Sequence, residues 1–267
     1  MDLFDESAWD AAGLGKGDIV HLETPLNPTG EAYDIQKFAD MAHRRGAYLS
    51  VDATFGPPGL QDPFLQGADV VMHSGTKYFG GHSDMLCGVL AVKNEEWWKG
   101  LWGERLLLGS VLGSLEGWLG VRSLRTLELR VQRQSSSATK LVQWLDSAMK
   151  EDNGDANVKK AVLRVQHASL QPQEEWLKIQ MPNGYGPVFA IWMRSKEAAR
   201  RLPSKLSLFH HATSLGGVES LIEWRKMSDP TVDERILRVS VGVEDWEDLR
   251  SDLGQAFKAL VEEGRVE

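Results

Sequence analysis

The chain has 267 residues, of which 25% are charged, and a formal charge of −8. This length allows one large domain or two smaller ones. The acidic balance argues against a nucleic-acid partner, because a phosphate backbone binds a basic face. The single cysteine, Cys87, cannot form an internal disulfide, which fits a reducing compartment.

Neither a targeting segment nor a membrane segment is predicted. The first ten residues are acidic, without a basic segment followed by an apolar one, so we expect no signal peptide. No apolar run approaches the ~18 residues of a membrane span. The sequence therefore predicts a cytoplasmic protein that binds neither membrane nor nucleic acid, and no motif in it predicts a metal site.

Strands and helices alternate in the first part of the chain. A helix is predicted after an N-cap at Asp34, with Ile35, Phe38 and Ala42 on one face. The predicted strands cover residues 19–23, 47–51, 70–73 and 86–92. This alternation predicts a mostly parallel α/β sheet, in which ligands lie at the carboxyl ends of the strands. Asn27, Asp52 and the segment 74–77 follow strand ends, so we expect them to converge on one crevice.

The pattern from residue 95 to about residue 149 is helical. We interpret its tryptophans as core or as a subunit contact before ligand surface; they are Trp97, Trp98 and Trp102. A second periodic series follows, with Leu112, Leu115, Leu119, Leu124, Leu127 and Val131. We place a domain boundary near residue 126, which gives a partial large domain (1–126) and a smaller C-terminal domain (127–267).

The C-terminal part mixes short strands with helices. Strands are predicted at 162–165, 186–193 and 236–241, and a helix at 196–202. The closing helix carries an apolar face that runs from Trp246 to Leu260, with Glu244 and Asp245 at its positive end. These elements predict a smaller α+β domain.

The most informative stretch is 69–84, DVVMHSGTKYFGGHSD. An apolar strand ends in a turn with two hydroxyls, Ser74 and Thr76, followed directly by Lys77. Burial lowers the pKa of a lysine and makes its amine nucleophilic toward an aldehyde, while hydroxyls and backbone N–H groups can hold a phosphate. This combination describes pyridoxal phosphate (PLP), although Ser-x-Thr-Lys alone is common in surface turns.

The whole stretch closely resembles the PLP-attachment signature of the Cys/Met-metabolism enzymes, the cystathionine γ-synthase and γ-lyase family. Residues 69–83 match this signature, and the resemblance extends from about residue 19 to the last helix. It implies a PLP-dependent fold of the aspartate-aminotransferase type (type I), with Lys77 carrying the cofactor. Within this stretch, Ser74 and Thr76 are the other residues expected to bind the cofactor.

The resemblance also assigns roles to residues in other loops. Asp52, in Asp-x-Thr, matches the carboxylate that keeps the cofactor's pyridine nitrogen protonated, although in isolation it is equally typical of a turn cap. Thr54 is the adjacent cofactor position. Asn27, in Glu-Thr-Pro-x-Asn-Pro-Thr, matches the asparagine near the ring oxygen, although Asn-Pro alone usually marks a turn.

Two further positions are expected to bind substrate. In the family, Arg-x-Ser-x-Gly-x-Glu carries the arginine that holds the substrate carboxylate, and Arg238 matches it. Taken alone, a charged residue within a strand is more often a solvated edge position. Ser214, in Ser-Leu-Gly-Gly, matches the loop that helps to bind the same carboxylate.

The chain departs from the family in two ways. Family members are about half as long again, so the chain is expected to lack an N-terminal part, as an incomplete gene model, a fragment or a degenerate paralogue. At the substrate end, Thr213 stands where several γ-lyases carry an acidic residue, and residues 222–225 replace an apolar, proline-containing segment. The exact reaction on the sulfur-containing substrate therefore stays open.

The leading hypothesis is a PLP-dependent transsulfuration-type enzyme, similar to cystathionine γ-synthase, that acts on sulfur amino acids or O-acylhomoserine by γ-elimination or γ-replacement. The alternatives are a cystathionine β- or γ-lyase and a truncated, non-catalytic paralogue. A general α/β binding domain without PLP leaves the long signature unexplained. The resemblance also implies a homo-oligomer, either a dimer or a tetramer.

Overall fold

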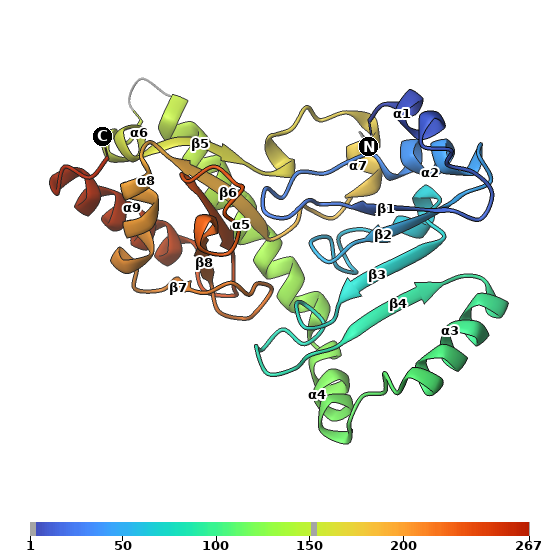
Figure 1. The fold of residues 1–267 in the computed structure, drawn as a ribbon. Coiled ribbons are helices and arrows are strands. Elements are labelled where there is room, and N and C mark those ends of the chain that lie inside the picture. Colours follow the sequence, from blue (N-terminus) through green and yellow to red (C-terminus); the bar gives the residue numbers. More distant parts are fainter. Residues whose placement is uncertain (1–3, 151–153, 267) are drawn as a thin grey trace.

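The computed structural model describes residues 4–150 and 154–266. Two sheets form the two halves of the molecule, and a long helix runs between them (Figure 1). This helix, α5 (Leu127–Lys150), starts beside the first half and packs along the second. The predicted α/β sheet and the predicted C-terminal mixture of strands and helices are both present.

The first sheet is mostly parallel, as the sequence predicted. Its strands, in spatial order, are β1 (Ile19–Glu23), β2 (Tyr48–Asp52), β3 (Val70–Ser74) and β4 (Gly88–Val92). The β1–β2 and β2–β3 pairs are parallel, whereas β4 runs antiparallel to β3. Parallel strands need a crossover between them, and α2 (Ile35–His43) is the crossover from β1 to β2.

The start of α2 follows the predicted capping pattern. The carboxylate of Asp34 accepts a hydrogen bond from the backbone N–H of Lys37 at 3.1 Å, which satisfies one of the free donors at the helix start. Ile35, Phe38 and Ala42 are buried in the core of the first half. The cap and the apolar stripe therefore fix both the start and the orientation of this helix.

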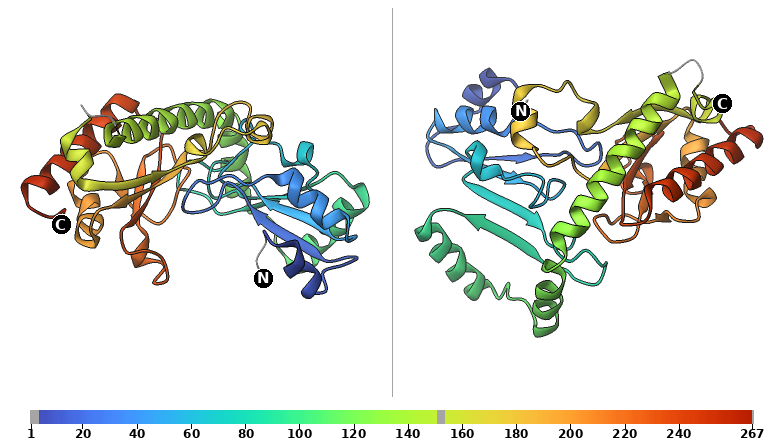
Figure 2. Two further views of the ribbon diagram at one scale, coloured as in Figure 1. Left: turned by 90° about the horizontal axis from the view of Figure 1, so that it is seen from above. Right: turned by 180° about the vertical axis from the view of Figure 1, so that it is seen from behind.

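The second sheet is mixed, and its strands come largely from the C-terminal part. Their spatial order is β5 (Val162–Gln166), β6 (Val188–Met193), β9 (Ile236–Ser240), β8 (Leu221–Trp224) and β7 (His210–His211). Only the β7–β8 pair is parallel. Helices α5 and α9 (Trp246–Glu262) cover one face (Figure 2), and leucines of both helices enter the same core.

The remaining elements are short or lie at the periphery. They are α1 (Glu6–Ala11), α3 (Glu95–Leu108), α4 (Ser114–Leu124), α6 (Ala156–Ala161), α7 (Glu175–Gln180) and α8 (Lys196–Arg201), with the 3₁₀ turns η1 (Pro63–Gln66), η2 (Ala168–Leu170), η3 (Leu202–Lys205) and η4 (Arg225–Met227).

The structure excludes one interpretation of the tryptophans and corrects the expectation for the leucine series. Trp98 and Trp102 are 52% and 45% exposed, so they are not core residues, and a subunit contact stays a prediction. The series from Leu112 to Val131 does not lie on one helix, because Leu112 precedes α4 and the chain breaks between α4 and α5. Leu115 on α4 is exposed, whereas Val131 on α5 is fully buried. Apolar periodicity indicates a contact surface, but it does not show whether this chain or another one covers it.

The predicted domain boundary near residue 126 lies in that break between α4 and α5, and the division into 1–126 and 127–267 stays a prediction. Within the residues that the structure describes, no helix is both long and apolar enough to span a membrane.

Candidate active site

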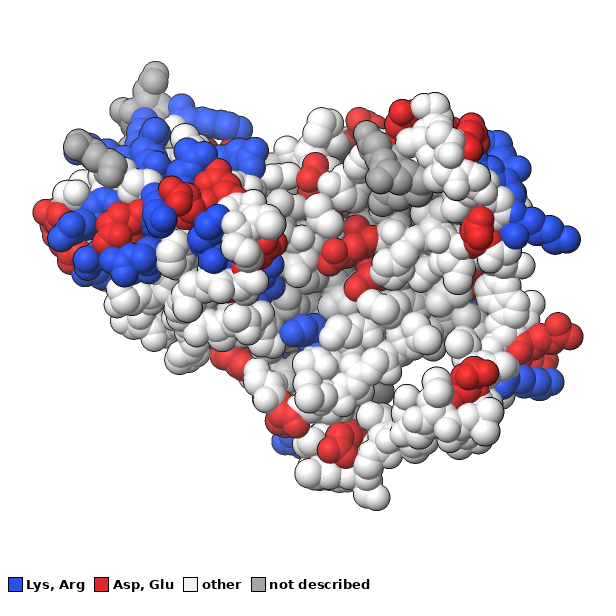
Figure 3. Space-filling model, viewed as in Figure 1, with Lys and Arg blue, Asp and Glu red and all other residues white. Residues whose placement is uncertain are grey.

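The candidate site lies where the two halves face each other. Strands β1, β2 and β3 are parallel, so their carboxyl ends, at Glu23, Asp52 and Ser74, meet at one edge of the first sheet. The space-filling view shows a largely uncharged central face, with a basic and an acidic patch between the halves (Figure 3). This location is the one expected for a ligand site in an α/β sheet.

Asp52 is held by the residue two positions later. The backbone N–H and the hydroxyl of Thr54 both donate to Asp52 Oδ1, at 2.9 and 2.6 Å. The Thr54 hydroxyl in turn accepts a hydrogen bond from the backbone N–H of Ser74 at 2.8 Å. This network ties the end of β2 to the end of β3 and orients the Asp52 carboxylate, because both donors act on the same oxygen.

Lys77 follows the turn after β3, and its side chain reaches the second half of the molecule. Its backbone N–H bonds to Ser74 O at 3.0 Å, and its Nζ donates to Ser214 Oγ at 3.4 Å. Burial lowers the pKa of the Lys77 amine, and the Arg238 guanidinium lowers it further, against the opposing effect of the Glu223 carboxylate. The amine is therefore more nucleophilic than that of an exposed lysine.

The loop that carries Ser214 lies directly against the lysine turn. Gly216 has φ +76°, and a Cβ at this position would come within 3.1–3.2 Å of Tyr78 N, Lys77 C and Lys77 Cβ. Its backbone N–H donates to Ser240 Oγ on β9 at 3.0 Å. Glycine is needed here both for the backbone conformation and for the close approach, and this contact brings Ser214 to Lys77.

Arg238 lies in the centre of the second sheet and is only 3% exposed, so it is not a solvated edge residue. Its guanidinium donates to Asn27 Oδ1 at 3.2 Å, and to the backbone oxygens of Thr213 and Ser214. It also forms an ion pair with Glu223 Oε2 at 2.7 Å. Arg238 thus connects the loop after β1 with the loop that contacts Lys77.

Sequence reasoning missed two acidic residues in this region. Glu223 faces Arg238 across the β8–β9 pair and is 1% exposed. Glu23 lies opposite Asp52 and accepts a bond from Asn27 N–H at 3.3 Å; burial raises the pKa of Glu23, and Asp52 raises it further. The only sequence signal for Glu23 was its place at a strand end just before the Asn27 loop.

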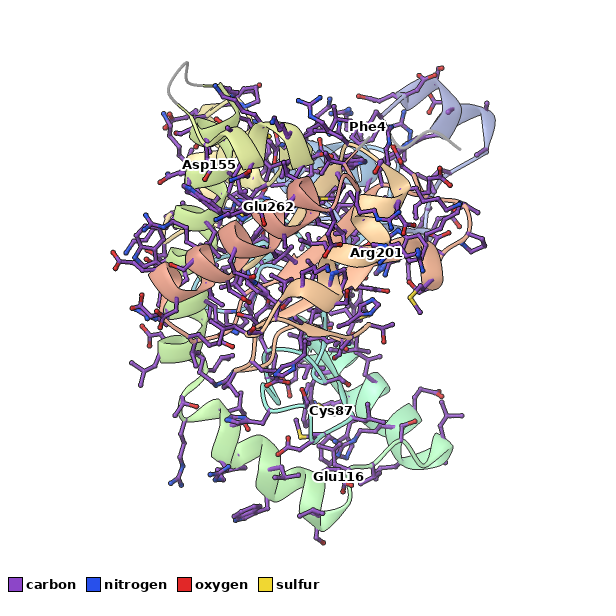
Figure 4. The ribbon with its side chains drawn as sticks, turned by 90° about the vertical axis from the view of Figure 1, so that its left-hand side faces the viewer. Phe4, Cys87, Glu116, Asp155, Arg201 and Glu262 are labelled. Carbon is purple, nitrogen blue, oxygen red and sulfur yellow. The ribbon has the colours of Figure 1, made fainter. Side chains whose placement is uncertain are left out.

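Thr76 has a different set of partners from its neighbours. Its backbone N–H bonds to Cys87 O at 3.2 Å, and its hydroxyl accepts a bond from Cys87 N–H at 3.3 Å. Figure 4 shows Cys87 at the end of the molecule where Glu116 of α4 lies. Thr76 therefore joins the lysine turn to the start of β4, and its role toward a cofactor phosphate stays a prediction.

The residues present fit PLP at its two reactive ends. Lys77 offers an amine of lowered pKa for the aldehyde, and Asp52 offers a carboxylate, held by Thr54, for the ring nitrogen. Ser74, which carries a hydroxyl, lies between Asp52 and Lys77 in the sequence, at the end of β3. Which residues contact the cofactor stays a prediction.

The fold is that of PLP-dependent enzymes of type I. The family model for Cys/Met metabolism PLP-dependent enzymes matches residues 1–258, and the chain belongs to this family. The apo structure of CalE6, a methionine gamma lyase from Micromonospora echinospora, superposes with a TM-score of 0.83 at 34% identity, covering 96% of this chain and 70% of that one.

Three curated relatives show the range of related activities. Cystathionine beta-lyase MetC of Bacillus subtilis is 35% identical over 91% of this chain and 62% of its own length. Cystathionine gamma-lyase of Dictyostelium discoideum is 38% identical over 91% of this chain and 63% of its own length. Cystathionine gamma-synthase of Escherichia coli is 34% identical over 97% of this chain and 68% of its own length. The chain thus spans less than two thirds of the length of the Bacillus subtilis and Dictyostelium discoideum relatives.

Proposed function

We propose that this chain binds PLP through Lys77 and takes part in a transsulfuration-type reaction on sulfur amino acids or O-acylhomoserine, similar to that of a cystathionine γ-synthase. The observation that carries the proposal is the contact of the Lys77 amine with Ser214, beside the buried Arg238. It places a reactive amine next to a guanidinium that suits an amino-acid carboxylate.

Each residue has a distinct role in this proposal. PLP, when bound, supplies an electron sink for negative charge at the substrate's α-carbon. Lys77 Nζ moves protons to and from the substrate carbons as general base and acid. The Asp52 carboxylate holds the proton on the ring nitrogen, and Arg238 orients the substrate through its carboxylate. Asn27 and Ser214 line the same region and are assigned to the cofactor and the substrate carboxylate, respectively.

The alternative reaction is a cystathionine β- or γ-lyase. Relatives of all three kinds have similar identities, 34–38%, so the comparisons favour none of them. Product analysis separates these activities: with cystathionine as substrate, cysteine or homocysteine is released by lyases, whereas O-acylhomoserine plus cysteine yields cystathionine with a synthase.

The first test asks whether the chain carries PLP on the predicted lysine. The purified chain is incubated with PLP and reduced with borohydride, and the labelled peptide is mapped by mass spectrometry. We expect the label on Lys77, its loss in Lys77→Ala and its retention in Lys99→Ala, which removes a lysine 64% exposed on α3. A label spread over exposed lysines, with none on Lys77, contradicts the proposal.

A labelled chain that turns over none of these substrates fits the second candidate, a non-catalytic paralogue. The label and the product assay together therefore separate cofactor binding from catalysis.

A further inference from the structure

Arg238 belongs to a buried three-residue charge cluster. Glu223 Oε2 lies 2.7 Å from Arg238 Nη2, and the same carboxylate accepts bonds from Arg225 Nη1 at 3.0 and 3.1 Å. The hydroxyl of Ser228 also donates to Glu223. The side chains of Arg238, Glu223 and Arg225 are 3%, 2% and 15% exposed. One buried carboxylate is thus shared by two guanidinium groups.

The sheet register explains this arrangement. Glu223 on β8 lies directly opposite Arg238 on β9, so their side chains leave the same face of the sheet. Arg225 comes two residues after Glu223, where β8 passes into η4, and its side chain returns to the Glu223 carboxylate. Within the described residues, Arg225 Nε is buried and has no hydrogen-bond partner, so this guanidinium is not fully satisfied by the protein.

The charge balance of the cluster depends on Arg225. Arg238 and Glu223 alone form a neutral buried pair, which has little net attraction for an anion. With Arg225 the cluster carries one net positive charge, and Lys77 and Arg238 both donate hydrogen bonds to Ser214. Burial lowers the pKa of Arg238, which Glu223 opposes and Arg225 reinforces. An unpaired buried charge is costly, so the cluster gains from a carboxylate ligand.

We propose that Arg225 is a positioning residue that shares Glu223 with Arg238 and thereby keeps the Arg238 site positively charged for the carboxylate of an amino-acid ligand. This inference rests on the proposed role of Arg238 in the preceding section. Arg225 acts through Glu223 and need not touch the ligand. Its effect is therefore on the affinity for the anionic group, and its removal leaves the fit of the remaining ligand atoms unchanged.

The test compares two ligands of similar shape, one with the carboxylate and one with a neutral carboxamide in its place. Binding of L-2-aminobutyrate and of L-2-aminobutyramide is measured by isothermal titration calorimetry, with both PLP-loaded and PLP-free protein. The readout is the ratio of the two affinities. We expect Arg225→Gln to lower the ratio about tenfold, as loss of one nearby charge in a partly desolvated site predicts. Arg225→Lys keeps the charge and should keep the ratio within about twofold.

The double variant Arg225→Gln/Glu223→Gln is the decisive control, because it restores one net positive charge on Arg238. We expect the double variant to recover most of the preference for the acid over the amide that Arg225→Gln loses. Circular dichroism confirms that each variant is folded. An unchanged ratio in Arg225→Gln, an equal loss of acid and amide binding, or no recovery in the double variant overturns the inference. A wild-type chain that binds the acid no more tightly than the amide also overturns the inference. The proposed function fails separately, through absence of the Lys77 label.

Discussion

At the scale of single residues, the site depends on Thr54. This side chain is 8% exposed, and its hydroxyl both donates to Asp52 Oδ1 and accepts from the Ser74 N–H. Thr54 therefore combines a structural role, joining two strand ends, with the orientation of the carboxylate assigned to the cofactor.

We predict that Thr54→Ala lowers the free energy of unfolding by about 1–3 kcal/mol, because it leaves the Ser74 N–H without its acceptor. Urea unfolding followed by circular dichroism measures this change. Thr54→Ser keeps the hydroxyl and loses only a methyl group, so it should retain most of the stability. Equal losses in the two variants would show that the methyl group, and not the hydroxyl, accounts for the stabilisation.

Most of the candidate site residues could be found from the sequence, because each lies in a short motif. The structure brings Lys77, Ser214, Asn27 and Arg238 into one series of contacts, although their roles stay predictions. Glu223 was not found as a site residue. Its importance comes from the β8–β9 register, which places it opposite Arg238, and a single sequence does not show which residues face each other across two strands.

At the scale of elements, local signals predicted the strands and capped helices well. Asp34 caps α2 and Asp245 caps α9, as their positions indicated. The short β7 and β8 were not predicted, because two to four residues are too few to show a period. The α3 tryptophans failed as core residues for another reason: α3 buries none of its residues among the described part of the chain.

One buried histidine connects two segments of the second half. His167 is fully buried between β5 and η2; its Nε2 lies 2.7 Å from Gly186 O, and its Nδ1 lies 2.8 Å from Ser169 Oγ. Burial lowers the pKa of His167 to about 4, against the opposing effect of the Gly186 carbonyl. Burial likewise lowers the pKa of His73 on β3 to about 4.

We predict that the protein loses stability when the pH falls from about 6.5 toward 4. In this range the unfolded histidines bind protons and the folded ones do not, so the free energy of unfolding rises with pH. Each histidine contributes a loss on the order of 3 kcal/mol over the full range. Urea unfolding at pH 7.5, 6 and 5 measures the slope, which His167→Gln should reduce. The same slope in the variant would exclude His167 as its source.

At the scale of the whole molecule, the first half exposes many large apolar side chains on two helices and the turn between them. The exposed apolar residues of α3, α4 and the turn between them form what we call the α3–α4 surface. They are Trp98, Leu101, Trp102, Leu106, Leu107, Leu108, Val111, Leu112, Leu115, Trp118, Val121 and Leu124. In Figure 1 both helices extend from the β4 side of the first sheet. Exposed apolar side chains gathered on neighbouring elements are typical of an interaction site.

We predict that the α3–α4 surface is covered by a second copy of the chain, as in the homo-oligomer that the family resemblance implies. Leu107 is 85% exposed and Trp118 61%, and charge at such positions opposes burial against another apolar surface. Sedimentation equilibrium should give a dimer or tetramer of the 29.7-kDa chain, and Leu107→Glu/Trp118→Glu should shift it to monomer. Ile179→Glu, at a site on α7 that is 59% exposed, should leave the assembly unchanged. A monomeric wild-type chain, or a double variant that assembles as the wild type does, would show that this surface does not join copies of the chain.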